Sequence, residues 1–356
     1  MSLTYGCAYS LQPRPAMNRP RLSASVLICT YNRAQLLREM LESLQTVQSA
    51  RVWDVVVVDN NSTDSTRAVV ESLIPVFPVP LVYLFEARQG KSYALNTGIQ
   101  ASRGEIIVFT DDDVRVAPGW LDAACSTFDE QPDIDYTGGP VRPIWGGAPP
   151  DWIDQRRGDL WGTLAILDYG DTSFVFEERR RVPLGANMAV RRRLIDRIGG
   201  FDPALGRRGR SLLGQEQAEF FARSREIGAR GVYVPAMELH HHVPQERLTK
   251  RYFRRWWYWK GVSRARVDAM HQQTELGLDL RAVPYVARVP RFIWGLLLRG
   301  IVNWIGAAVR RQRLNAARHQ MQCAYALGYV RACWTRDSRQ RVAALSPRQE
   351  SASVSR

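Results

Sequence analysis

Cysteine is scarce in this 356-residue sequence, and none of the five cysteines stands in a C-x-x-C pair or in dense spacing. This pattern excludes a disulfide framework and is typical of a protein from a reducing compartment. The sequence also lacks a G-x-G-x-x-G after its first predicted strand, where Thr30-Tyr31-Asn32-Arg33 stands instead. That absence disfavours a dinucleotide-dependent oxidoreductase built on a similar sheet.

Long hydrophobic runs are rare as well. Residues 1–22 lack the basic, then apolar, then small-residue pattern of a signal peptide, and we expect a disordered leader there. The nearest candidate for a membrane span covers residues 292–309 and has Arg299 in its middle. Because a span normally needs ~20 apolar residues and a central Arg is costly, we expect this segment to lie in the plane of a membrane interface.

Acidic residues are few in the C-terminal third of the chain. The whole chain has a net charge of +14, and residues 247–345 contain 20 Lys and Arg against 4 Asp and Glu. That segment therefore carries +16 and the remaining residues together carry −2. Such a segment suits an anionic membrane surface, a helical cap on another domain, or a nucleic acid. Since the basic residues lie outside the predicted ligand crevice, we do not expect nucleic acid as a partner.

Strand-like and helix-like segments alternate in the N-terminal part of the chain. Continuous apolar runs, typical of strands buried on both faces, occupy residues 25–29, 55–58, 81–85 and 106–110. Helical spacing of apolar residues follows the first run, and further helices are predicted at 91–102 and from Pro118 onward. This alternation predicts an α/β fold with a mostly parallel, Rossmann-like sheet flanked by helices.

Polar clusters follow all four predicted strands, at residues 30–33, 59–64, 86–90 and 111–113. In open parallel sheets, ligands bind beyond the carboxyl ends of the strands. The last cluster is Asp111-Asp112-Asp113, and three adjacent carboxylates repel one another unless a cation is present. A single Asp would suffice to cap the following helix, so three favour a site for Mg²⁺ or Mn²⁺.

Four ordered motifs resemble family 2 glycosyltransferases of the GT-A fold, over about residues 23–245. They are residues 25–33 (SVLICTYNR), 57–64 (VVDNNSTD), 88–96 (RQGKSYALN) and 110–113 (TDDD). The resemblance implies an inverting, metal-dependent transfer of a sugar from a nucleotide-diphosphate donor to an acceptor hydroxyl. It implies a sugar-donor half at 23–137 and an acceptor half at 138–245.

The resemblance also implies roles for individual residues. The nucleoside would be held by Thr30, Tyr31, Arg33 and Asp59. Arg88, with Gly90 and Lys91, offers cations near where the diphosphate would lie, although Lys91 taken alone could equally belong to a solvated basic loop. Asp111 and Asp113 would hold the metal, with Asp113 as its most direct ligand, and Asp112 would lie nearer the ribose or sugar. The turn at residues 185–187 places Asn187 near sugar donor and acceptor. His241 lies in a run of three histidines and matches a further metal ligand of the family. The alternative interpretation of this run is a surface loop.

One position departs from the family pattern. Members usually have Glu-Asp at the start of the helix after the acceptor loop, and the acid there acts as general base. Here Glu216 matches the Glu, but Gln217 occupies the Asp position and cannot accept a proton. Either Glu216 is the base, or the base lies elsewhere, or the chain is a weak or inactive homologue that binds nucleotide sugar or glycan. We expect Glu216, with Glu219 in reserve.

The C-terminal part is predicted to be a basic amphipathic helical extension at 246–345, followed by a disordered tail at 346–356. Residues 251–260 interleave Arg and Lys with Trp and Tyr, a pattern suited to lipid headgroups. We therefore expect contact with an anionic membrane through residues 247–310. The predicted location is cytoplasmic, peripheral on the inner face of the inner membrane, with a glycan or a lipid-linked molecule as acceptor.

Overall fold

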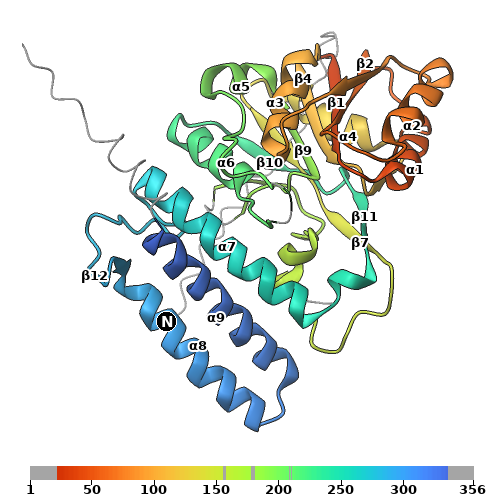
Figure 1. Cartoon of the computed structure of the whole chain (residues 1–356). Coiled ribbons are helices and arrows are strands. Elements are labelled where there is room, and N and C mark those ends of the chain that lie inside the picture. The colour runs from red at the N-terminus through yellow and green to blue at the C-terminus, as the bar shows by residue number, and fades with distance from the viewer. Residues whose placement is uncertain (1–21, 155–157, 178–180, 208, 210, 336–356) are drawn as a thin grey trace, which may run out of the picture.

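The computed structural model describes residues 22–154, 158–177, 181–207, 209 and 211–335 (Figure 1). The disordered leader predicted for residues 1–22 lies outside this range except for its last residue, and so does the tail predicted for 346–356. The boundary predicted between residues 245 and 246 falls inside the described part of the chain.

One mixed sheet of eight strands forms the centre of the fold, in the order β3-β2-β1-β4-β9-β6-β10-β8. Its strands are β1 (Ala24–Thr30), β2 (Trp53–Asp59), β3 (Leu81–Phe85), β4 (Ile106–Asp111), β6 (Tyr136–Gly138), β8 (Phe174–Val175), β9 (Asn187–Arg191) and β10 (Gly231–Tyr233). The first four strands are mutually parallel, whereas β9 runs antiparallel to β4 and β6. The predicted α/β class with a mostly parallel sheet is confirmed.

Helices cover both faces of this sheet. They are α1 (Ala34–Gln45), α2 (Thr66–Leu73), α3 (Lys91–Ala101), α4 (Trp120–Glu130), α5 (Arg192–Ile198) and α6 (Glu216–Glu226), with short 3₁₀ turns η1 (Ile74–Val76), η2 (Gly158–Leu164) and η3 (Gln245–Arg247). Successive side chains of a strand point to opposite faces, so Val55 and Val57 join one core while Val56 and Val58 join the other. Burial of both faces explains the uninterrupted apolar runs.

A second, three-stranded sheet lies beside the carboxyl end of β4. It consists of β5 (Val114–Val116), β11 (Leu239–Val243) and β7 (Val141–Trp145), with β11 in the middle. Between residue 231 and the histidines the chain forms two strands, β10 in the large sheet and β11 in the small one. In the register of β5 and β11, His241 pairs with Val114, directly after Asp113.

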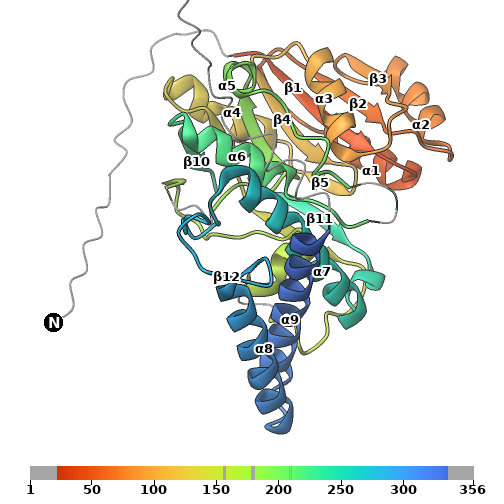
Figure 2. The same cartoon turned by 60° about the vertical axis from the view of Figure 1, so that its left-hand side comes forward.

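The predicted extension is helical. It contains α7 (Lys250–His271), a small hairpin of β12 (Tyr285–Val286) and β13 (Val289–Pro290), then α8 (Arg291–Val309) and α9 (Arg313–Trp334). Figures 1 and 2 show α7 beside the sheet domain and the α8–α9 pair extending away from it. Within the described part of the chain, α8 is the one helix long and apolar enough to cross a membrane.

Two glycines let α7 and α9 approach closely. A Cβ atom added at Gly261 on α7 would overlap the backbone carbonyl of Tyr325 on α9. One added at Gly328 on α9 would likewise overlap the carbonyl of Tyr258 on α7. Both backbones are therefore in contact, and neither helix can move outward without losing the packing of Tyr329, which is almost fully buried.

We predict that Gly328→Ala destabilises the protein by about 1–3 kcal/mol, because the methyl group forces the two backbones apart. The measurement is the melting temperature of the full chain. Gly306→Ala on α8 is the matched control, since its Cβ would meet no atom within 4 Å and alanine favours a helix. Equal melting temperatures for the two variants would contradict the assigned backbone contact.

Candidate active site

A cavity of about 750 Å³ opens at the carboxyl ends of β1 and β4. Eight of the eleven predicted site residues line it: Thr30, Tyr31, Arg33, Asp111, Asp112, Asp113, Glu216 and His241. They come from the ends of two strands, the start of α6 and the middle of β11. The fold thus assembles most of the predicted set into one space, although the residues are up to about 200 positions apart in the chain.

The three adjacent carboxylates at the end of β4 are held by cations of the protein. Lys91 Nζ lies 2.7 Å from Asp111, and Arg33 Nη1 lies 2.8 Å from both Asp112 and Asp113. Burial is the largest influence and would raise the pKa of Asp111, but the charge and hydrogen bond of Lys91 together with His241 lower that pKa. Burial prevails at Asp112, whose pKa is raised to about 6 despite Arg33. The cluster therefore depends on compensating positive charge.

Asp113 has a carboxylate oxygen that can still bind a ligand. Its Oδ1 is buried and has no hydrogen-bond partner among the described residues, while His241 Nε2 lies 3.4 Å away. Its Oδ2 is 3.7 Å from Arg247. Burial opposes ionisation of Asp113, but His241, Arg33 and Arg247 together hold its pKa below the ordinary range. An ionised oxygen beside an imidazole nitrogen is a donor set that suits a divalent cation.

The geometry of this pair allows a shared cation. Two atoms that bind one first-row metal ion at about 2.1 Å each must lie within ~4 Å of each other, and the Asp113–His241 separation of 3.4 Å satisfies that limit. No group of three His, Cys, Asp or Glu side chains within the described ranges is placed to enclose a metal. The two-residue pair of Asp113 and His241 fits Mg²⁺ or Mn²⁺, because these ions keep coordination positions open for phosphate oxygens.

Asp59 and Arg88 are two of the three predicted site residues that do not line the cavity. Asp59 accepts hydrogen bonds from the Ser62 amide at 2.8 Å and the Tyr83 hydroxyl at 2.9 Å, and it is buried. Arg88 donates to Glu86 at 2.8 and 2.9 Å and lies over the ring of Tyr93. Their roles remain predictions from the family pattern.

The cation that the loop after β3 does bring into the cavity is Lys91, at the start of α3. Burial would lower the pKa of Lys91, but Asp111 and Glu216 raise it above its usual range. Lys91 is therefore charged, and its positive charge interacts both with Asp111 at the end of β4 and with Glu216 at the start of α6. In the sequence, Lys91 can be located because it directly follows Gly90, whose φ of 146° favours glycine.

Asn187 makes its hydrogen bonds within the protein, and its contact with sugar donor and acceptor stays a prediction. Its side-chain amide donates to the carbonyls of Pro140 at 2.8 Å and Met237 at 2.6 Å, and its oxygen accepts from Trp120 at 3.0 Å. The residue is fully buried and is absent from the cavity lining, which includes its neighbours Gly185 and Ala186. Asn187 thus ties β9 to the loops before β7 and β11.

Glu216 begins α6 and lines the cavity, with only 8% of its surface exposed. Its Oε2 has no hydrogen-bond partner within the described residues. The preceding Gln215 has a φ of 75°, a left-handed conformation that is costly for a residue with a side chain. The backbone is therefore held in an unfavourable conformation where it presents this carboxylate.

Gln217 occupies the position of the usual base, but its side-chain amide holds the 183–185 loop against α6. Its side-chain oxygen accepts a hydrogen bond from the Gly185 amide at 2.7 Å. Its nitrogen donates to the Pro183 carbonyl at 2.9 Å. A carboxylate could make the first bond but would be repelled by the Pro183 oxygen. The amide thus explains the departure from the family pattern, because it fixes the 183–185 loop to α6.

Glu219, considered as a reserve base, is engaged in packing α6 against α7. Arg223 donates two hydrogen bonds to it, at 2.7 and 2.8 Å, and His271 Nε2 lies 3.5 Å away. The other nitrogen of His271 lies 2.8 Å from Glu226. Glu219 does not line the cavity. Glu216 is therefore the α6 carboxylate that faces the cavity.

Helix α7 forms part of the cavity wall, although its basic and aromatic sequence predicted a membrane surface. Arg255, Trp256, Lys260 and Arg264 all line the cavity. The last three lie four residues apart and so share one face of the helix. The four-residue spacing can be seen in the sequence, but the sequence does not show that this face of α7 lines the cavity. The interpretation of α7 as a cap on the catalytic domain is the one that this geometry supports.

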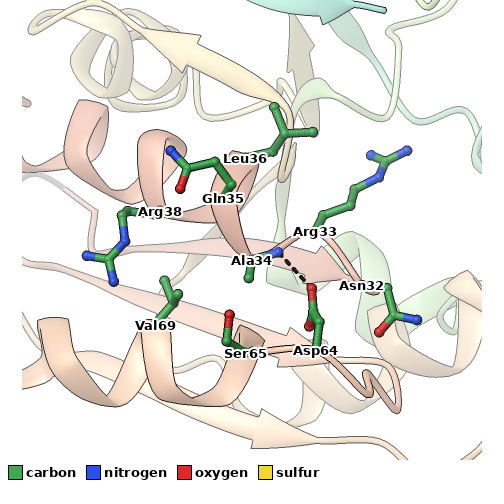
Figure 3. A pocket seen from close by; sticks show the side chains of 9 residues that line it. All are labelled: Asn32, Arg33, Ala34, Gln35, Leu36, Arg38, Asp64, Ser65 and Val69. Carbon is green, nitrogen blue, oxygen red and sulfur yellow. Dashed lines mark hydrogen bonds between the residues drawn. The ribbon is translucent and has the colours of Figure 1, made fainter. Parts of the chain in front are cut away.

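A second, shallower hollow adjoins Arg33 at the start of α1 (Figure 3). Its lining includes Asp64, whose carboxylate accepts a hydrogen bond from the Ala34 amide at 3.0 Å. Asp64 therefore caps α1 from a different loop, since Arg33 provides no side-chain cap. The hollow contains none of the β4 carboxylates.

Known proteins resemble this chain in sequence and in fold. Residues 25–199 match the model of glycosyl transferase family 2. Succinoglycan biosynthesis protein ExoM of Rhizobium meliloti is 30% identical over 251 residues, which cover 67% of this chain and 74% of that protein. The glucosyl-dolichyl phosphate glucuronosyltransferase of Haloferax volcanii is 25% identical over 255 residues, covering 71% of this chain and 79% of that protein.

Among solved structures, a mannosyltransferase of Pyrobaculum calidifontis in complex with GDP-Man and Mn²⁺ superposes with a TM-score of 0.58. The alignment covers 90% of this chain and 91% of that chain at 20% sequence identity, so it establishes the fold alone. The sheet and its flanking helices therefore have the GT-A fold. With the sequence matches, the chain belongs to glycosyl transferase family 2.

We predict a pH-dependent contribution of His271 to stability. The Glu219 carboxylate, 3.5 Å from Nε2, raises the pKa of His271, burial opposes it, and Glu226 adds to the increase. Because the folded pKa exceeds the unfolded value of about 6.5, the contribution is full below that pH and is lost as pH rises through the folded pKa. Chemical denaturation should show the destabilisation by His271→Gln shrinking from about pH 6 to pH 9.

The control for this series is His319→Gln on α9, where the ring contacts Gln322 at 3.5 Å instead of a carboxylate. Its effect on the unfolding free energy should not change over the same pH range. A pH-independent effect of His271→Gln would disprove the ionic link between α6 and α7.

Proposed function

We propose that this glycosyltransferase moves a sugar from a nucleotide-diphosphate donor to an acceptor hydroxyl, with inversion at the anomeric carbon and with Mg²⁺ or Mn²⁺. The observation that carries the proposal is the buried Asp113 oxygen without a hydrogen-bond partner among the described residues, 3.4 Å from His241. Glu216 lines the same cavity. One space thus contains a metal-binding pair and a candidate base.

Asp113 and His241 would hold the cation, and Asp111 is predicted to assist once its pairing with Lys91 relaxes. The cation would neutralise charge that builds on the leaving diphosphate. Lys91 and Arg33 lie beside the same carboxylates and would add positive charge there. This arrangement supports departure of a diphosphate leaving group.

The reaction would be a single in-line displacement. Glu216 accepts the proton of the acceptor hydroxyl while the acceptor oxygen bonds to the anomeric carbon. The bond from that carbon to the diphosphate oxygen breaks, and the nucleoside diphosphate leaves with the electron pair. A buried carboxylate whose Oε2 has no hydrogen-bond partner within the described residues is suited to this role, because it gives up no existing bond there to take the proton.

The nucleoside would lie against Thr30, Tyr31 and Arg33, with Asp59 and Asp112 reaching the base and the ribose. Thr30 and Tyr31 support this assignment by lining the cavity at the end of β1. Tyr31 is 44% exposed, so its ring is accessible for stacking against a base. Arg88 would need to leave Glu86 to reach a diphosphate.

The acceptor would be a glycan or a lipid-linked molecule, in the synthesis of a cell-surface polysaccharide or glycolipid. The names of the two relatives support this, since one specifies succinoglycan and the other a glucosyl-dolichyl phosphate. The enzyme would act as a peripheral protein on the cytoplasmic face of the inner membrane. Because α7 lines the cavity, the predicted contact through 247–310 narrows to α8, which exposes Leu298, Val302 and Ile305.

The catalytic assignments are tested by two isosteric variants. Asp113→Asn should abolish Mn²⁺-dependent turnover of the nucleotide sugar, and Glu216→Gln should lower transfer by ~10²–10⁴. Glu42→Gln, an exposed change on α1, is the control. Turnover is measured as nucleoside diphosphate released, with a panel of nucleotide sugars. Full activity of Asp113→Asn would refute the metal site, and an inactive wild type across the panel would favour a binding homologue.

Membrane contact through α8 is tested by flotation with anionic vesicles. Leu298→Glu combined with Val302→Glu should abolish co-flotation, because both side chains are more than 60% exposed on the apolar helix. Val52→Glu, an exposed apolar position on the sheet domain, is the matched control and should float like the wild type. Flotation of the double variant would place the membrane contact elsewhere.

A further inference from the structure

Asn60 is a buried polar residue that directly follows β2 and reaches the edge of the cavity. Its backbone amide donates to the carbonyl of Thr30, the last residue of β1, at 2.9 Å. Its backbone carbonyl accepts a hydrogen bond from the side chain of Gln89, in the loop after β3, at 2.9 Å. Asn60 is therefore bonded to the segments that follow two neighbouring strands of the large sheet.

The side chain of Asn60 binds the backbone of the loop after β3. Its Nδ2 donates to the carbonyls of Arg88 at 2.8 Å and Glu86 at 3.3 Å, and its Oδ1 accepts from the Gly90 amide at 2.8 Å. Both N–H bonds of the side-chain amide are thus used within the protein. An amide suits this position because it offers two donors and an acceptor at once, whereas a carboxylate would be repelled by both carbonyls.

These bonds hold the backbone where α3 begins. Gly90 precedes α3 and has a φ of 146°, a conformation that favours glycine, and its N–H is the one bound by Asn60. The next amide, that of Lys91, donates to the carbonyl of Arg207 at 3.1 Å. The first residue of α3 is therefore fixed in place by two segments that lie far apart in the chain.

Lys91 depends on this backbone for the position of its charge. Its Nζ lies 2.7 Å from Asp111, and its side chain is 28% exposed where it lines the cavity. A lysine ammonium group is carried on a flexible four-carbon stem, so its position follows from where the backbone starts the side chain. Release of the loop after β3 would give the ammonium group other places to lie, and the ordered one would cost conformational entropy.

We infer that Asn60 is a positioning residue for binding of the nucleotide diphosphate, because it fixes the Lys91 ammonium group through the loop after β3. The inference rests on the proposed function, in which Lys91 adds positive charge beside the leaving diphosphate. Asn60 acts through Lys91 and does not donate to the phosphates, since both of its side-chain N–H groups are bonded to the loop. Removal of the Asn60 side chain therefore weakens diphosphate binding only while Lys91 is present.

The test measures binding to the full chain by calorimetry in the presence of Mn²⁺. The ligand is UDP or GDP, whichever raises the melting temperature of the wild type more. Asn60→Ala is the test variant, since it removes the three side-chain bonds without adding a charge. It is measured alone and combined with Lys91→Met, which is also measured alone.

The matched control is Asn96→Ala, on α3 itself and outside the cavity lining. The Asn96 side chain donates to the carbonyl and accepts from the amide of Phe201, both at 2.8 Å, so its removal also costs backbone bonds. Gly90→Ala is a second test variant, because it strains the same loop while leaving the Asn60 side chain intact. It replaces Asn60→Ala if melting curves without ligand show that Asn60→Ala is unfolded.

Asn60→Ala and Lys91→Met should each weaken binding by at least about tenfold, the loss expected for a charge-assisted hydrogen bond. Their combination should bind within about twofold of Lys91→Met alone, because residues that act through one contact are not additive. Asn96→Ala should bind like the wild type. Wild-type affinity of Asn60→Ala or of Lys91→Met would overturn the inference. A full further loss when Asn60→Ala is added to Lys91→Met would overturn it too.

The wild type and Asp113→Asn separate this inference from the proposed function. No binding of either nucleotide by the wild type with Mn²⁺ would refute the proposed function, and the positioning role with it. Binding by the wild type that is lost in Asp113→Asn and unchanged in a folded Asn60→Ala would refute the positioning role alone.

Discussion

The mutual repulsion of three carboxylates at the end of β4 is the constraint around which this site is built. Each is buried or nearly so, and each is compensated by a cation from another element. Arg33 precedes α1, Lys91 begins α3 and Arg247 ends η3. Three segments far apart in the chain are therefore drawn to one strand end, and the cavity is the space they leave.

The small sheet completes that arrangement. Pairing of β11 with β5 sets His241 opposite Val114, so the imidazole reaches Asp113 by backbone register and not by loop flexibility. A shift of one residue would turn His241 to the other face of the sheet. The Asn187 amide, which bridges the loops before β7 and β11, helps to maintain this register. Residues without a chemical role thus determine where the chemical ones lie.

The helical extension contributes to the wall of the candidate active site. α7 lines the cavity, His271 of α7 lies 3.5 Å from Glu219 of α6, and glycines bring α7 and α9 into backbone contact. The domain boundary predicted at residue 245 follows composition and charge, whereas residues on both sides of that boundary line the cavity. This coupling gives a physical route by which binding at the apolar surface of α8 can influence the acceptor side.

The sequence by itself determined the strand order along the chain, the α/β class and the strand-end carboxylates, because buried parallel strands require continuous apolar runs followed by polar turns. It also indicated Glu216 and His241, through local motifs. Tertiary structure alone decided which groups Asn187 and Gln217 bond within the protein, that Lys91 and not Arg88 lines the cavity, and that α7 faces the site. The reason is physical: local patterns specify which groups a residue offers, but the partners of an amide or a cation are chosen by elements that only folding brings together.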